Sequence, residues 1–180
     1  MYKDAVLNLS SDVKNDRTIG YSLVLAREFS LHLAAVSFAY EAVPAAMLAD
    51  DISADFIDRM QKQAEDNAKA AVATFEQAAR EAAISIQAQW ITASFAGTAD
   101  LFGRIARRFD LSIVRQPEPD KNTPDAMIVE SALFDSGRPV VVVPYIQTDP
   151  PSFKRALVCW DGSHNAARAV GDALPFLKRA

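Results

Sequence analysis

Five short apolar runs, separated by longer stretches of helical character, constrain the fold of this chain more than any other feature. The runs are residues 5–9, 33–38, 85–91, 111–114 and 139–144. Most of them are continuously apolar, which is typical of strands buried on both faces of a sheet. Buried strands joined by helices predict a doubly wound α/β domain with a five-stranded parallel sheet and right-handed crossovers.

Three of the stretches between these runs carry clear signs of a helix. From Ala54 to Ala83, apolar residues recur at three- and four-residue spacing, so we predict a long crossover helix, with a coiled coil as the competing interpretation. Thr98 and Thr123 are predicted N-caps of two further helices, and Pro124 suits the first helical position after Thr123. The runs and helices together predict one domain over residues 1–146.

Charge and cysteine content exclude several classes of function. Nineteen Lys and Arg residues stand against 23 Asp and Glu residues, a formal net charge of −4, so we expect no nucleic-acid or membrane partner. The only cysteine, Cys159, cannot form an intrachain disulfide and fits a reducing compartment. No apolar run approaches the roughly 18–20 residues that span a bilayer, and the N-terminus lacks the features of a secretory signal, so we expect a cytoplasmic protein.

The end of the chain repeats the pattern of its beginning. After a linker-like stretch at residues 147–153, Lys154–Ala180 aligns without gaps on Lys3–Phe29, with five identities over 27 positions. Both segments read as an apolar strand, a polar turn and an amphipathic helix. We therefore predict a partial second repeat at residues 154–180, whose strand includes Cys159 and Trp160 as core side chains.

Two segments resemble the universal stress protein family. In that family an apolar first strand is followed by Asp-Gly-Ser, and here Leu157–Trp160 is followed by Asp161, Gly162 and Ser163. Val140–Pro144 is similar to the last strand of the family. The resemblance covers the whole chain and implies the adenine-nucleotide alpha hydrolase-like fold, with one complete module and the first strand and helix of a tandem second module.

The same resemblance implies a nucleotide site from which the first module departs. Family members that bind ATP place an Asp after the first strand and a glycine-rich loop after the fourth, because bare backbone N–H groups and a helix N-terminus favour phosphate. Here Ser10 stands at the Asp position, and Arg115 and Glu118 stand at glycine positions. Prolines and acids occupy the rest of this region: Pro117, Pro119, Asp120 and Asp125. We therefore expect a degenerate site at Ser10 and Arg115 and no cofactor in the first module.

The second repeat leaves two interpretations open. Asp161, Gly162 and Ser163 form either part of a nucleoside site, which would allow ATP in a second module, or a simple turn in which Ser163 caps the last helix. No metal site is expected, because His32 and His164 have no Cys or carboxylate at ligand spacing along the chain.

The function that the resemblance implies is a stress-response module. No nucleophile–base pair can be named, so the sequence favours a non-enzymatic scaffold or dimerisation domain. A lone strand and helix cannot bury both of their faces, so we expect a homodimer or a dimer with exchanged tails, or else a chain that is a fragment of a longer two-module protein. The alternative is a stress regulator that binds ATP or another adenine nucleotide in a second module.

Overall fold

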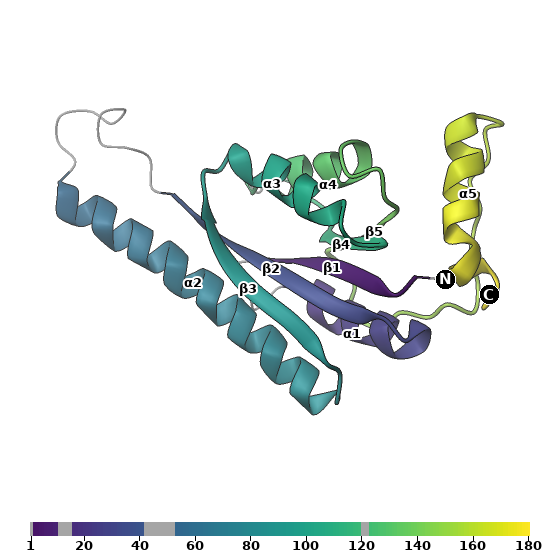
Figure 1. The fold of residues 1–180 in the computed structure, drawn as a ribbon, viewed down its shortest axis with the longest axis horizontal. Coiled ribbons are helices and arrows are strands. Elements are labelled where there is room, and N and C mark those ends of the chain that lie inside the picture. The colour runs from purple at the N-terminus through teal and green to yellow at the C-terminus, as the bar shows by residue number, and fades with distance from the viewer. Residues whose placement is uncertain (1, 11–15, 42–52, 120–122) are drawn as a thin grey trace.

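The computed structural model describes residues 2–10, 16–41, 53–119 and 123–180. Within these residues, five parallel strands form one sheet in the order β3-β2-β1-β4-β5 (Figure 1). The strands are β1 (Asp4–Leu9), β2 (His32–Tyr40), β3 (Ile86–Ala93), β4 (Leu111–Arg115) and β5 (Val140–Val143). Every apolar run of the first module is a strand, and the predicted doubly wound α/β fold is confirmed.

Helices cover both faces of this sheet. They are α1 (Thr18–Phe29), α2 (Ala54–Glu81), α3 (Gly97–Ala106) and α4 (Asp125–Phe134). Side chains that alternate along β1 enter two separate cores: Leu7 packs with residues of α1 and α2, whereas Val6 packs with residues of α3 and α4. Because both faces are covered, β1 and β4 are buried along almost their whole length, which explains why their sequences are continuously apolar.

The long helix α2 is a crossover helix, as the sequence predicts. Ser53 caps it by accepting a hydrogen bond from the backbone N–H of Phe56, and its buried face consists of Ala68, Ala71, Phe75 and Ala79. It connects β2 to β3 and packs on both strands. No helix in the described parts of the chain is long and apolar enough to cross a membrane.

Two predicted helix caps are wrong. Thr98 lies inside α3, where its hydroxyl donates to the carbonyl of Ser94, and it is the Ser94 side chain that accepts from the first helical amide, that of Gly97, at 3.1 Å. Thr123 donates to the carboxylate of Asp125 at 2.9 Å and does not cap a backbone amide of α4. Both threonines donate their hydroxyl hydrogen to an acceptor close in sequence, so neither hydroxyl acts as the cap that accepts from a helical amide.

The C-terminal segment contributes one helix, α5 (His164–Leu177), capped by Ser163 as the simple-turn interpretation predicts. The predicted strand before it is not formed, because no neighbouring strand in this chain offers it a ladder of hydrogen bonds. Cys159 is exposed and the Trp160 side chain is 60% exposed, so the prediction that they belong to a core is also wrong for this chain.

An aromatic cluster attaches α5 to the domain. The Phe176 ring lies 4.8 Å from that of Phe29 and 5.8 Å from that of Tyr2, measured between ring centroids, and Phe153 completes the cluster. Arg179 forms an ion pair of 3.1 Å with Glu28 at the same place. No residue of α5 is fully buried, so this contact is small. Figure 1 accordingly shows α5 standing beside the sheet, next to the N-terminus, and not on either of its faces.

Candidate functional site

The candidate site lies between β1 and β4, where the order in which the chain adds strands to the sheet changes direction. Strand β1 has β2 on one side and β4 on the other, so the connections leaving β1 and β3 run in opposite directions at this point. In open parallel sheets, ligands bind beyond the carboxyl ends of the strands at such a switch point. Ser10 follows β1, and Arg115 ends β4, so the structure brings both predicted site residues to this end of adjacent strands.

Arg115 is buried at this end, although it is a charged residue. Its side chain is 4% exposed and its guanidinium forms an ion pair of 3.1 Å with the carboxylate of Glu118. Both residues stand at positions where the resemblance places glycines. The loop after β4 therefore carries a cation and an anion that neutralise each other, in the place where a phosphate loop would present bare amides.

Asp125 adds a buried carboxylate at the first turn of α4. Burial raises the pKa of its carboxyl group, and the charges of Asp16 and Glu118 raise it further, against the lowering effects of the Thr123 hydrogen bond and the Arg115 charge. The charges that act on Asp125 thus comprise two carboxylates, of Asp16 and Glu118, and one guanidinium. This balance repels an anion, although the N-terminus of a helix by itself attracts one.

Tyr40, at the end of β2, belongs to this site and was missed by sequence reasoning. Burial raises the pKa of its phenol, and the charge of Asp125 raises it further. Its ring also lies 5.8 Å from that of Phe95, between centroids. The only signal in the sequence is its place two residues after the run 33–38, which alone does not single out a residue.

The backbone of Ser10 is fixed by the carboxylate of Asp16, which follows the loop after β1. Its backbone N–H donates to the carboxylate of Asp16 at 2.9 Å, and the same carboxylate accepts from the backbone N–H of Thr18 at 2.9 Å, at the start of α1. The loop between Ser10 and Asp16 lies outside the described residues, as does Asp120. The described part of the loop after β1 is therefore organised around an acidic side chain.

The second predicted group of site residues lies apart, in the C-terminal segment. The carboxylate of Asp161 accepts from the backbone N–H of Ser163 at 2.9 Å, and the Ser163 hydroxyl accepts from the backbone N–H of Ala166 at 3.1 Å. Gly162 has a positive φ of 78°, which glycine adopts without strain. Hydrogen bonds from Ser163 lower the pKa of Asp161. These residues form a capped turn, and their hydrogen bonds are made with one another and with α5.

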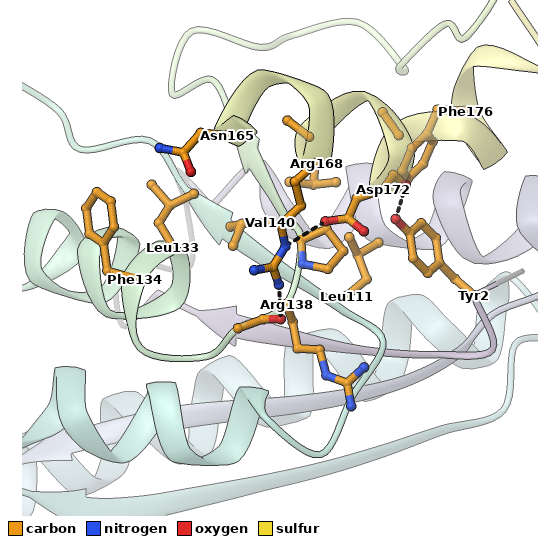
Figure 2. Close-up of a pocket in the computed structure, with 15 residues that line it drawn as sticks. Tyr2, Leu111, Leu133, Phe134, Arg138, Val140, Asn165, Arg168, Asp172 and Phe176 are labelled. Carbon is orange, nitrogen blue, oxygen red and sulfur yellow. Dashed lines mark hydrogen bonds and ion pairs between the residues drawn. The ribbon is translucent and has the colours of Figure 1, made fainter. Parts of the chain in front are cut away.

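A cavity of about 550 Å³ lies elsewhere, between α5 and the β5 edge of the sheet. We refer to it as the α5–β5 groove. Figure 2 shows Leu133, Phe134 and Val140 on one side of it and Asn165 and Arg168 of α5 on the other. The Arg168 guanidinium donates to the carbonyl of Gly137 at 2.8 Å and so connects the two sides. The groove does not include Arg115 or Asp125, and sequence reasoning did not predict it.

No metal-binding cluster occurs in the described part of the chain, where no three His, Cys, Asp or Glu side chains come together as ligands. His32 does meet a carboxylate, that of Asp4, with its Nδ1 atom 3.3 Å from the oxygen. This pair joins the starts of β1 and β2, at the opposite end of the strands from the switch point.

Comparison with known proteins identifies the fold. No family model matches the sequence, and no curated protein does. Among solved structures, the universal stress protein UspA from Lactobacillus plantarum is similar, with a TM-score of 0.57 at 10% identity over 79% of this chain and 97% of that protein. A universal stress family protein from Burkholderia pseudomallei gives 0.56 at 13% identity, over 79% and 96% of the two chains. A universal stress protein in complex with cAMP gives 0.52 at 17% identity, over 79% and 97%. The chain therefore has the universal stress protein fold, as the resemblance in its sequence implied.

Proposed function

We propose that this chain is a universal-stress-type scaffold module whose own nucleotide site is degenerate and which acts by self-association. The observation that carries this proposal is the buried Arg115–Glu118 pair at the end of β4. A guanidinium and a carboxylate occupy the phosphate-loop positions, and Asp125 places a further buried carboxylate at the start of α4. An incoming phosphate would have to break the pair and overcome the negative charge.

The C-terminal segment supports self-association, because it has the composition of a buried unit. The residues of α1 that are buried are Thr18, Ile19, Ser22, Leu25, Ala26 and Phe29. Their counterparts in the repeat are all apolar: Ala169, Val170, Ala173, Phe176, Leu177 and Ala180. None of these counterparts is fully buried here. The segment therefore has the sequence pattern of the first strand and helix of the module, and a partner surface that covered these apolar side chains would stabilise it.

A second candidate function is a regulator that binds an adenine nucleotide through the tail. It is favoured by the exposed turn at Asp161, by the Gly162 backbone and by the solved structure of similar fold that contains cAMP. In this function the turn would contact the nucleoside, and the phosphates would lie in a loop that this chain does not carry in its first module.

Thermal unfolding in the presence of nucleotides separates the two functions. The melting temperature would be measured with ATP, ADP, AMP and cAMP, each with and without Mg²⁺. For the scaffold we expect no shift at millimolar nucleotide, whereas a ligand at 100 times its Kd adds about 2.7 kcal/mol to the free energy of unfolding. A rise that grows with nucleotide concentration would contradict the degenerate site.

The variant Asp161→Ala then decides where such a nucleotide binds. A shift that disappears in Asp161→Ala supports the regulator, and a shift that persists in it indicates binding at the switch point. Asp161 is exposed, so its removal is not expected to unfold the domain.

A further inference from the structure

A second groove lies on the sheet, in the half where the strands begin and thus away from the switch point. Helix α3 packs on α4 and β1, and α4 packs on β4 and β5, so β3 is left largely uncovered on this face. The side chains of Gln87 and Gln89 point to this face and are exposed, because their neighbours Ile86 and Ala88 pack in the core on the other face. A cavity of about 280 Å³ remains between β3 and the end of α3, and we refer to it as the α3–β3 groove.

The floor and one wall of the α3–β3 groove are apolar. Val6, Ala34 and Val36 line it with buried side chains of β1 and β2. Ile105, in the last turn of α3, and Phe109, just after this helix, line it from the side and are partly buried. A hydrocarbon group placed here would exchange water for contacts with these side chains.

Three polar side chains complete the lining, namely Gln87, Gln89 and Arg108. The described residues that line the groove include no acid, so the guanidinium of Arg108 supplies their only formal charge. The nearest acid along the chain, Asp110, accepts hydrogen bonds from two backbone N–H groups at the start of β1. The groove therefore combines an apolar floor with one cation and two amide groups that can donate hydrogen bonds.

Arg108 differs from the other arginines at the end of α3, because its guanidinium has no ion-pair or hydrogen-bond partner among the described residues. Arg104 forms an ion pair of 3.3 Å with Asp100, and the Nε–H group of Arg107 donates to the carbonyl of Asp135 at 3.1 Å. The Arg108 guanidinium is therefore free to bind an anion that enters the groove.

We propose that the α3–β3 groove binds a small carboxylate that carries an apolar chain. The carboxylate accepts hydrogen bonds from Arg108 and from the amides of Gln87 and Gln89, and a guanidinium binds such a group more strongly than a neutral one. The apolar chain lies on Val36 and Ile105. At about 30 Å³ for each heavy atom, the 280 Å³ of the groove holds about nine heavy atoms, which limits the size of the ligand.

A titration of the ¹⁵N-labelled chain, followed by NMR, tests this proposal with hexanoate as the probe, since hexanoate fits the size limit. We expect saturable shifts of the side-chain amide signals of Gln87 and Gln89, with a Kd in the millimolar range that is usual for so small a ligand. Hexanamide has the same chain without the charge, and acetate has the charge without the chain. Each should bind about ten-fold more weakly than hexanoate.

The variant Arg108→Gln removes the charge and should weaken hexanoate about ten-fold, to the affinity of hexanamide. The matched control is Arg104→Gln, on the same helix but outside the groove, which should bind hexanoate as the unmodified chain does. Both arginines are exposed, so neither variant should unfold. The proposal is overturned by absent shifts at Gln87 and Gln89, by equal binding of either control compound, or by undiminished binding in Arg108→Gln.

The same spectra show whether a second copy of the chain covers the groove instead. Without ligand, the side-chain amide signals of Gln87 and Gln89 should stay in place when the protein is diluted. Signals that move on dilution would make the groove an interface between copies and would overturn the carboxylate site.

Discussion

The guanidinium of Arg115 lies 3.1 Å from the carboxylate of Glu118, and this arginine side chain is only 4% exposed at the end of a central strand. A buried cation requires its counter-ion, because the interior solvates it poorly. The pair thus places two charged side chains, one of each sign, at the start of the loop after β4.

Removing the counter-ion should therefore destabilise the domain. We expect Glu118→Ala to lower the free energy of unfolding by about 3 kcal/mol, the lower end of the range for broken buried pairs, because Glu118 itself keeps some contact with water. Urea denaturation measures this. The control is Glu65→Ala, which breaks the exposed pair with Lys69 and should cost less than about 0.5 kcal/mol. Equal losses for the two variants would show that Arg115 does not depend on Glu118.

Asp125 should make stability depend on pH in the opposite sense to an ordinary paired acid. Because burial raises its pKa in the folded state, the folded protein holds this proton more tightly than the unfolded chain does. Its contribution to stability is therefore greatest below the ordinary pKa of Asp and is lost as the pH rises through the raised value.

Replacing this acid by its neutral isostere isolates the effect. Asp125→Asn should melt at a higher temperature than the unmodified chain at pH 7, and the difference should shrink toward zero as the pH falls below the ordinary Asp range. Melting temperatures of both chains between pH 4 and pH 8 provide the test. A constant difference over this range would mean that Asp125 does not titrate in the folded protein with a raised pKa.

The contact between α3 and α4 depends on a glycine. A Cβ atom at Gly103 would come within 2.3 Å of the hydroxyl oxygen of Ser131, so Gly103→Ala should lower the free energy of unfolding by about 1–2 kcal/mol. Ser131→Ala in the same chain should restore most of the loss, because that hydroxyl has no hydrogen-bond partner among the described residues. Gly20→Ala is the matched control: a Cβ there meets nothing within 4 Å, and stability should rise by up to about 1 kcal/mol.

Phe176 should control whether α5 remains attached. Its ring contacts those of Phe29 and Tyr2, whereas no residue of α5 is fully buried. In Phe176→Ala, the amides of residues 164–177 should exchange with deuterium faster, while those of β1 and β4 keep their protection, because local opening then needs less free energy than global unfolding. Hydrogen-exchange mass spectrometry measures both. Leu174→Ala should leave the exchange of α5 unchanged, and slow exchange in both variants would contradict this account.

The elements that local patterns specify were predictable from the sequence. The strands of the first module, the long helix α2 and the cap at Ser163 all follow from side chains close together in the chain, since burial on two faces, helical spacing and a capping hydroxyl are local properties. The sequence also showed that Arg115 and Glu118 stand where the family pattern has glycines, because this comparison needs only the identities of the residues. Their ion pair joins residues three positions apart.

Features that depend on distant parts of the chain were not predictable. Tyr40 meets the charge of Asp125 only because β2 ends near the place where α4 begins. The caps predicted at Thr98 and Thr123 failed for a local reason, because spacing alone does not tell whether a hydroxyl accepts from a helical amide or donates to another group. Residues 156–160 show this most clearly, because they align with β1 but lack the two neighbouring strands that pair with β1.

The amino-acid sequence alone determined the α/β class of this protein, the order of its strands and helices along the first module, and the absence of glycines directly after the fourth strand. Only the tertiary structure decided that the charges of Asp16, Glu118 and Arg115 act on the buried Asp125, that a groove separates α5 from β5, and that residues 156–160 form no strand. The physical reason is that periodicity and capping are set by neighbours in sequence. Burial, electrostatic fields and strand pairing are set by neighbours in space.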